Sequence, residues 1–110
     1  MDVRDNDEMI LEQGIALIGL IDASILGRPA LVRIFLERGA DPNFQEETGM
    51  TALMAGSLIG NIDIVRLLLV RGADPNIRDN EGRTAFSMAT RAGYTDIVEL
   101  LEHHRLTRIQ

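Results

Sequence analysis

The sequence predicts an all-α protein, built as a solenoid of stacked helix–turn–helix units. The segment "RGADPN" at 38–43 returns at 71–76, a shift of 33 residues. The same shift carries Gly27 onto Gly60 and then onto Gly93. Within each unit the apolar residues recur at helical spacing, and one short unit can bury such a face only against its neighbours. A repeat of this length with this periodicity therefore indicates stacked helix pairs.

The N-terminal segment departs from the repeat. Residues 7–26, "DEMILEQGIALIGLIDASIL", are expected to form one or two helices that close the N-terminal end of the stack. Asp7 and Glu8 suit a helix start, because acidic side chains favour the positive end of the helix dipole. Gly14 and Gly19 leave room for a break between two helices.

The middle unit shows clear helix boundaries. The stretch "TALMAGSLI" begins with Thr51, whose side chain can cap the free N–H groups of a helix, and it ends before Gly60. Glycine suits the left-handed end of a helix. A second helix is predicted in "IDIVRLLLVR", residues 62–71, and Gly72 ends it. The following "ADPN" has the composition of a turn.

The second helix of each unit supplies the predicted core. Aligning the units on the 33-residue shift places apolar residues in four columns. We expect these columns to be buried between successive units. The columns are Leu31/Ile64/Ile97, Val32/Val65/Val98, Ile34/Leu67/Leu100 and Phe35/Leu68/Leu101.

The last unit has the features of a C-terminal cap. Glu102 stands where Leu36 and Leu69 stand in earlier units, so the apolar face narrows where no further unit follows. Arg105 takes the position of Gly72. The chain is thus expected to be one capped domain, 1–110, divided into an N-terminal cap with a degenerate first repeat, a second repeat, and a capping third repeat with a tail (1–43, 44–76 and 77–110).

The repeated units resemble the ankyrin repeat. The resemblance covers about residues 27–104 and is carried by "GMTALMAGSLIGNIDIVRLLLVRGADPN" and "DNEGRTAFSMATRAGYTDIVELLEHH". It implies an ankyrin-repeat solenoid whose units are joined by β-turn-like loops. The proline that follows threonine in the family is Ala52 and Ala85 here, and the family's histidine two residues later is Met54 and Ser87. In the family that histidine helps to tie neighbouring turns, so its loss predicts a less rigid stack.

Composition argues against several classes of partner. The net charge of −6 is the opposite of the basic stripe that a nucleic acid requires. The absence of cysteine removes disulfides and zinc–cysteine sites. The N-terminal apolar run is interrupted by Glu12 and Asp22, too often to span a bilayer, and the acidic start differs from a signal peptide. We therefore expect a cytoplasmic protein that binds neither nucleic acid nor membrane.

No catalytic constellation emerges from the sequence. His103 and His104 are the only histidines, and adjacent helical positions point about 100° apart, which disfavours a shared metal ion. The serines have no positioned histidine base, and the acidic turns lack the spacing of a calcium loop. The prediction is a protein that is not an enzyme, with no catalytic residue, no cofactor and no metal.

The two positions before each inter-helix glycine differ between the units. They are Ile25-Leu26, Leu58-Ile59 and Arg91-Ala92. The ankyrin resemblance implies that these positions face the concave side, where partners commonly bind together with the turn tips. We therefore predict an apolar docking patch with a polar rim, consisting of Ile25, Glu47, Met50, Leu58, Ile59, Asn80, Glu81, Arg83 and Arg91.

A structural interpretation of these positions stays open. One residue of each pair can instead pack against the neighbouring unit, and the N-terminal helix can cover Ile25 and Leu26. For function, the resemblance implies a non-catalytic adaptor or inhibitor that binds a partner protein as a monomer or weak homodimer. Two alternatives remain, an obligate homo-oligomeric structural protein and a regulatory subunit of a separate enzyme.

Overall fold

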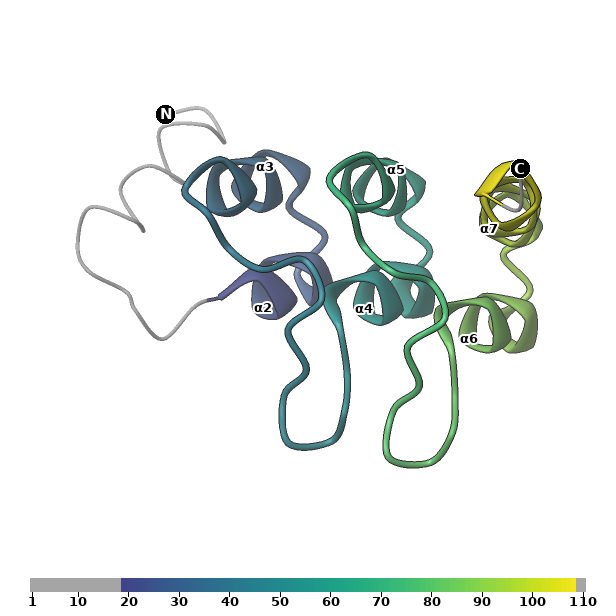
Figure 1. Cartoon of the computed structure of the whole chain (residues 1–110). Coiled ribbons are helices and arrows are strands. Elements are labelled where there is room, and N and C mark those ends of the chain that lie inside the picture. Colours follow the sequence, from purple (N-terminus) through teal and green to yellow (C-terminus); the bar gives the residue numbers. More distant parts are fainter. Residues whose placement is uncertain (1–18, 109–110) are drawn as a thin grey trace.

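The computed structural model describes residues 19–108, and every regular element in that range is a helix. The all-α solenoid expected from the repeat is confirmed (Figure 1). The helix starts expected at Asp7 and Glu8 lie outside the described residues. The helices are α2 (Leu20–Ile25), α3 (Pro29–Glu37), α4 (Ala52–Ile59), α5 (Ile62–Val70), α6 (Ala85–Ala92) and α7 (Thr95–Arg108).

The helices form two layers. In Figure 1 the inner layer of α2, α4 and α6 lies below the outer layer of α3, α5 and α7, and each layer follows the order of the repeats. Two hairpin turns, residues 38–51 and 71–84, connect successive pairs and project in the same direction from the inner layer. The inner helices and the two turns thus make one continuous side of the solenoid, which we call the inner face.

The predicted helix boundaries are confirmed at the residues that set them. The Thr51 Oγ1 accepts a hydrogen bond from the Met54 N–H at 3.2 Å and so caps α4. Asn61 caps α5 by accepting from the N–H of the third residue of that helix at 3.1 Å. Gly60 and Gly93 end α4 and α6 with φ of 80° and 82°, a left-handed conformation that glycine adopts without steric cost.

Helix α2 begins one position later than the repeat predicts. The 33-residue shift would place the first residue of α4, Ala52, on Gly19, but α2 starts at Leu20. Gly19 is instead the residue before the helix, and its N–H donates to the Asp22 Oδ2 at 3.1 Å. The N-terminal unit therefore builds its helix start with an acidic side chain inside the helix rather than with a threonine cap.

The core follows three of the four predicted columns closely. Leu31, Ile64 and Ile97 are fully buried, and the second and fourth columns are buried except for half-buried Val98 and Phe35. In the column Ile34/Leu67/Leu100 all three side chains are only half-buried, although Leu67 and Leu100 still pack against the core.

The third unit ends differently from the others. Helices α3 and α5 each have nine residues and stop before Gly39 and Gly72, whereas α7 continues for 14 residues through Arg105. Without a glycine to adopt a positive φ, the chain stays helical. Arg105 also forms an ion pair with half-buried Glu102, one helical turn earlier. A charged pair thus occupies the face that an additional unit would cover.

Candidate functional site

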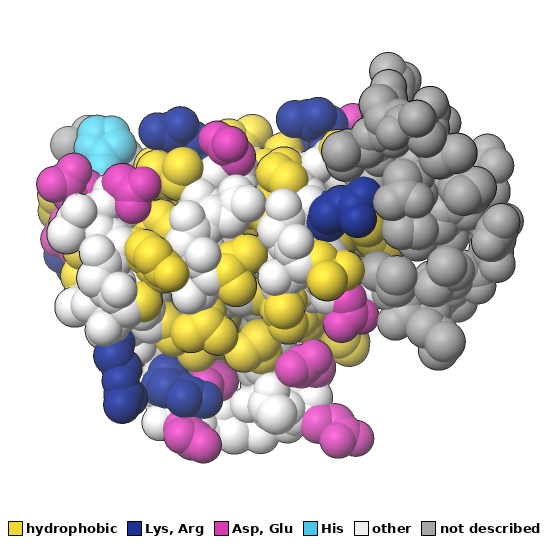
Figure 2. All heavy atoms as spheres, turned by 180° about the vertical axis from the view of Figure 1, so that it is seen from behind, with side chains coloured by type: hydrophobic (Ala, Val, Ile, Leu, Met, Phe, Trp, Pro, Cys, Tyr) yellow, Lys and Arg dark blue, Asp and Glu magenta, His cyan; other side chains and the backbone are white. Residues whose placement is uncertain are grey.

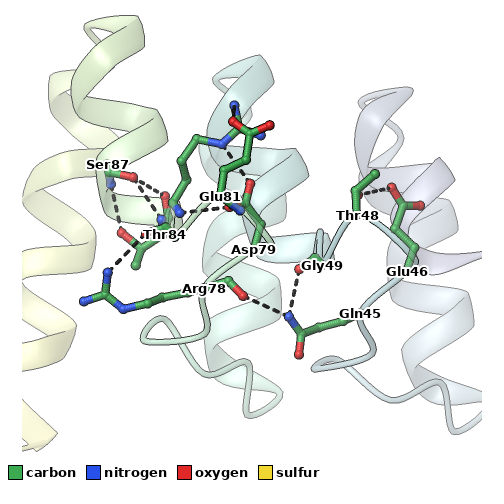
Figure 3. Close-up of polar contacts among 11 residues, drawn as sticks. Gln45, Glu46, Thr48, Gly49, Arg78, Asp79, Glu81, Thr84 and Ser87 are labelled. Atoms are coloured by element: carbon green, nitrogen blue, oxygen red, sulfur yellow. Dashed lines mark hydrogen bonds and ion pairs between the residues drawn. The ribbon is translucent and has the colours of Figure 1, made fainter.

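The two hairpin turns are tied together by hydrogen bonds, which fixes the lower part of the inner face. The Asn80 N–H donates to the Thr48 carbonyl at 3.0 Å, and the Asn80 Nδ2 donates to the Glu47 carbonyl at 2.6 Å. Figure 3 shows the Gln45 side chain between the turns, where its Nε2 donates to the carbonyls of Gly49 and Arg78 at 2.9 and 3.0 Å. The turns therefore form one connected ledge below the helices.

A second set of hydrogen bonds, made by Asn43, also joins the two turns. The Asn43 Oδ1 accepts from the Asp74 N–H at 2.7 Å, and the Asn43 Nδ2 donates to the Gly72 carbonyl at 3.2 Å. Gln45 and Asn80 add the contacts just described. The lower rigidity expected from Met54 and Ser87 stays a prediction, but neighbouring turns do not depend on a histidine for their hydrogen bonds.

The second turn contains a buried carboxylate paired with an arginine. The Asp79 side chain accepts from the N–H groups of Glu81 and Arg83 at 2.9 and 2.8 Å, and the Arg83 Nε donates to the Asp79 Oδ2 at 2.8 Å. Burial by itself opposes ionisation of Asp79, but these hydrogen bonds and the arginine charge outweigh it and lower the pKa of Asp79. The carboxylate thus organises the turn and holds the Arg83 side chain in place.

A hollow of about 510 Å³ lies on the inner face between α4, α6 and the second turn. Three of the predicted partner-binding residues, Leu58, Arg83 and Arg91, meet there. Leu58, near the end of α4, is 48% exposed, and buried Met88 contributes to the lining. We call this the inner hollow, lined by Leu58, Arg83, Ser87, Met88, Arg91 and Ala92.

The other predicted apolar residues do not line the inner hollow. Ile25 and Leu26, at the end of α2, are 45% and 59% exposed, and the residues before Gly19 that were expected to cover them lie outside the described part of the chain. Ile59 is half-buried, and its Cδ1 lies 3.5 Å from the position that a Cβ on Gly27 would occupy. Ile59 therefore packs toward the preceding unit, as the structural interpretation allowed. Met50 is half-buried and packs against the core.

The predicted polar residues lie on the ledge. Glu47, Asn80 and Glu81 are exposed and lie outside the inner hollow. The side-chain amide of Asn80 donates a hydrogen bond to the preceding turn, so Asn80 has a structural role in joining the two turns. Glu81 lies 3.8 Å from the Arg83 guanidinium. Their role in partner binding stays a prediction.

Three residues of the inner hollow were not predicted from the sequence. Ser87, Met88 and Ala92 all come from α6, and Met88 and Ala92 are four positions apart, as are Ser87 and Arg91. Residues at that spacing share one side of a helix, so the prediction of Arg91 as a site residue could have been extended to the residue one turn earlier on α6. Met88 is both buried and part of the lining.

Hydrophobic side chains gather on the side of the molecule that Figure 2 shows. They form a broad area in the middle of the view, with arginine and acidic side chains toward the turns at the bottom. Within residues 19–108, no three side chains of histidine or acidic residues are grouped to hold a metal ion. None of the described helices combines the length and apolarity needed to cross a bilayer.

The arrangement of paired helices and projecting turns agrees with a family comparison. Residues 20–108 match the family described as ankyrin repeats, in three copies. This chain belongs to the ankyrin-repeat family. No curated protein was found to match the chain. Ankyrin repeats generally mediate binding between proteins and are typically not catalytic, which makes the inner face of this ankyrin-repeat protein the surface of interest.

Proposed function

We propose that this ankyrin-repeat protein is a non-catalytic adaptor or inhibitor that binds a partner protein across its inner face, in the cytoplasm. The observation that carries the proposal is the half-exposed Leu58, which opens onto a hollow between two inner helices. The inner hollow combines an apolar lining from Leu58, Met88 and Ala92 with two arginines, and an apolar centre with a polar rim is the usual composition of a protein–protein interface.

The connected ledge supports the same proposal. Because Asn80 and Gln45 hold the two turns together, the inner face is organised before any partner arrives. Preorganisation lowers the entropic cost of association. Covering the exposed half of Leu58 would contribute roughly 1 kcal/mol, from the value for full burial of a leucine side chain. A contribution of this size makes Leu58 a measurable part of the binding free energy but not the whole of it.

The test compares two variants of the whole chain, each with one apolar residue replaced by arginine. Leu58→Arg places a charge in the inner hollow, whereas Val70→Arg places the same charge on the outer helix α5, where Val70 is 81% exposed. Tagged chains are used for affinity capture from the source cell, followed by mass spectrometry. We expect the parent chain and Val70→Arg to capture the same partner protein in similar amounts. Leu58→Arg should capture at least about tenfold less of it, since this variant loses apolar burial at the interface and must desolvate a charge.

Two controls complete this experiment. Helical circular dichroism and the melting temperature must be unchanged in Leu58→Arg, which separates lost binding from lost folding. Light scattering over a range of concentrations tests the alternative of an obligate homo-oligomer. Equal capture by both variants would contradict the proposed site, and a concentration-independent oligomer abolished by Leu58→Arg would assign the inner hollow to self-association instead.

A further inference from the structure

The charge of the inner layer changes sign along the solenoid. Asp22 is the only charged residue of α2, α4 has none, and Arg91 is the only charged residue of α6. The turns differ in the same sense, since residues 41–50 contain three acidic residues and no basic residue, whereas residues 74–83 contain three acidic residues and two arginines. The inner face is therefore negative beside the first repeat and carries its positive charge beside the inner hollow.

The two arginines of the inner hollow differ in whether their guanidinium groups already have an acidic partner within the chain. Arg83 is held by Asp79, with an N–O distance of 2.8 Å, and Glu81 lies 3.8 Å away. Arg91 is exposed, and within residues 19–108 its side chain forms no hydrogen bond or ion pair. A guanidinium that a partner covers without offering an acceptor loses its hydration uncompensated. A partner that fills the inner hollow must therefore supply an acceptor for Arg91.

We propose that the partner binds through an acidic–aliphatic segment, with an aliphatic side chain in the inner hollow against Leu58 and Met88 and a carboxylate on Arg91. This inference rests on the proposed function of the inner face. Carboxylates match the planar guanidinium with two parallel hydrogen bonds, which a neutral acceptor does not reproduce. The apolar lining from Leu58, Met88 and Ala92 accounts for the aliphatic part.

The charge distribution also sets the direction of the bound segment. A carboxylate placed over α2 would meet Asp22 and the acidic residues of 41–50, which repel it. The acidic end therefore lies over α6, and the part of the segment that crosses toward α2 is neutral or basic. This arrangement excludes partners that are uniformly acidic, because the overall charge of −6 opposes them.

The experiment is a selection from a displayed library of random linear peptides against the full chain. The same library is selected in parallel on Leu58→Arg, so that peptides dependent on the inner hollow are identified by their loss. We expect the Leu58-dependent peptides to be enriched in aspartate or glutamate within a few positions of leucine, isoleucine, valine or methionine. Any basic residues in these peptides are expected on the side of the aliphatic position opposite to the acidic residues.

Charge variants then test the contact with Arg91 in binding titrations with the selected peptides. We expect Arg91→Gln to weaken binding about three- to tenfold and Arg91→Glu to weaken it more than about tenfold, as for partly exposed ion pairs. Arg33→Glu makes the same change of charge on the outer helix α3, where Arg33 is exposed, and is expected to leave binding within about twofold. Added salt is expected to reduce the difference between the parent chain and Arg91→Glu.

The outcomes separate this inference from the proposed function. Leu58-dependent peptides without acidic enrichment, or with binding insensitive to Arg91→Glu, overturn the acidic–aliphatic segment while leaving the inner hollow as a docking site. Recovery of no Leu58-dependent peptide counts against both. A loss of binding in Arg33→Glu as large as in Arg91→Glu would show a general charge effect and overturn the specific contact.

Discussion

Two equivalent glycines provide a direct test of how the hairpin turns stack. Gly49 and Gly82 occupy the same position in successive turns and have φ of 86° and 79°. A Cβ on Gly49 would lie 2.7 Å from the Asn80 nitrogen and 2.8 Å from the Asp79 Cα, which are backbone atoms of the next turn. A Cβ on Gly82 would meet nothing within 4 Å, because in the described structure no further turn follows.

The two alanine variants therefore share one cost and differ in a second. Each places a side chain in the left-handed region, which costs about 1–2 kcal/mol, partly offset by reduced freedom of the unfolded chain. Gly49→Ala must also push the turns apart, and overpacking of this kind costs about 1–3 kcal/mol. The displacement strains the hydrogen bonds from Asn80 to Thr48 and Glu47, each contributing about 0.5–1.5 kcal/mol.

Thermal and urea unfolding, followed by circular dichroism, measure the difference. We expect Gly49→Ala to unfold at least about 5 °C below Gly82→Ala, since 1 kcal/mol corresponds to roughly 4–8 °C for a domain of this size. Both proteins should keep the helical spectrum of the parent chain at low temperature. Equal losses of stability in the two variants would refute the steric argument and show that only the left-handed backbone matters.

Two further predictions concern buried polar groups. Ser57 is fully buried, and its hydroxyl has no hydrogen-bond partner among residues 19–108, so Ser57→Ala should raise the free energy of unfolding by about 1 kcal/mol in urea titrations. Ser24→Ala is the matched control without this gain, because the Ser24 hydroxyl donates to the Leu20 carbonyl at 2.9 Å; a destabilised Ser57→Ala would show that the hydroxyl has a partner. Because the pKa of Asp79 is lowered in the folded state, its ionised form stabilises the fold at any pH above the ordinary pKa of aspartate, near 4. This stabilisation disappears as the pH falls through the lower pKa of the folded state. Asp79→Asn should therefore be less stable than the parent chain at pH 7, with the difference shrinking below about pH 4; a difference independent of pH between 7 and 2 would contradict this linkage.

The sequence was sufficient to predict the repeat, the helix pairs and the ends of α4, although α2 begins one position later than the repeat predicts. These features depend on residues within about four positions of each other, such as Thr51 with the N–H of Met54, or the glycine at position 60 with its positive φ. The longer α7 also follows from a local change, the replacement of a glycine by Arg105. Local hydrogen bonds and backbone freedom are encoded where they act, and so they can be read from the chain.

Only the tertiary structure decided which predicted residues share a site. Leu58 and Ile59 are neighbours in the sequence, but the first opens onto the inner hollow while the second packs toward Gly27 in the preceding unit. Likewise the Arg83 side chain is held by Asp79, whereas the Arg91 side chain forms no ion pair or hydrogen bond within the described chain. Exposure and pairing of this kind are set by how one unit stacks on the next, and the repeat shows which positions are equivalent but not how far each side chain is covered.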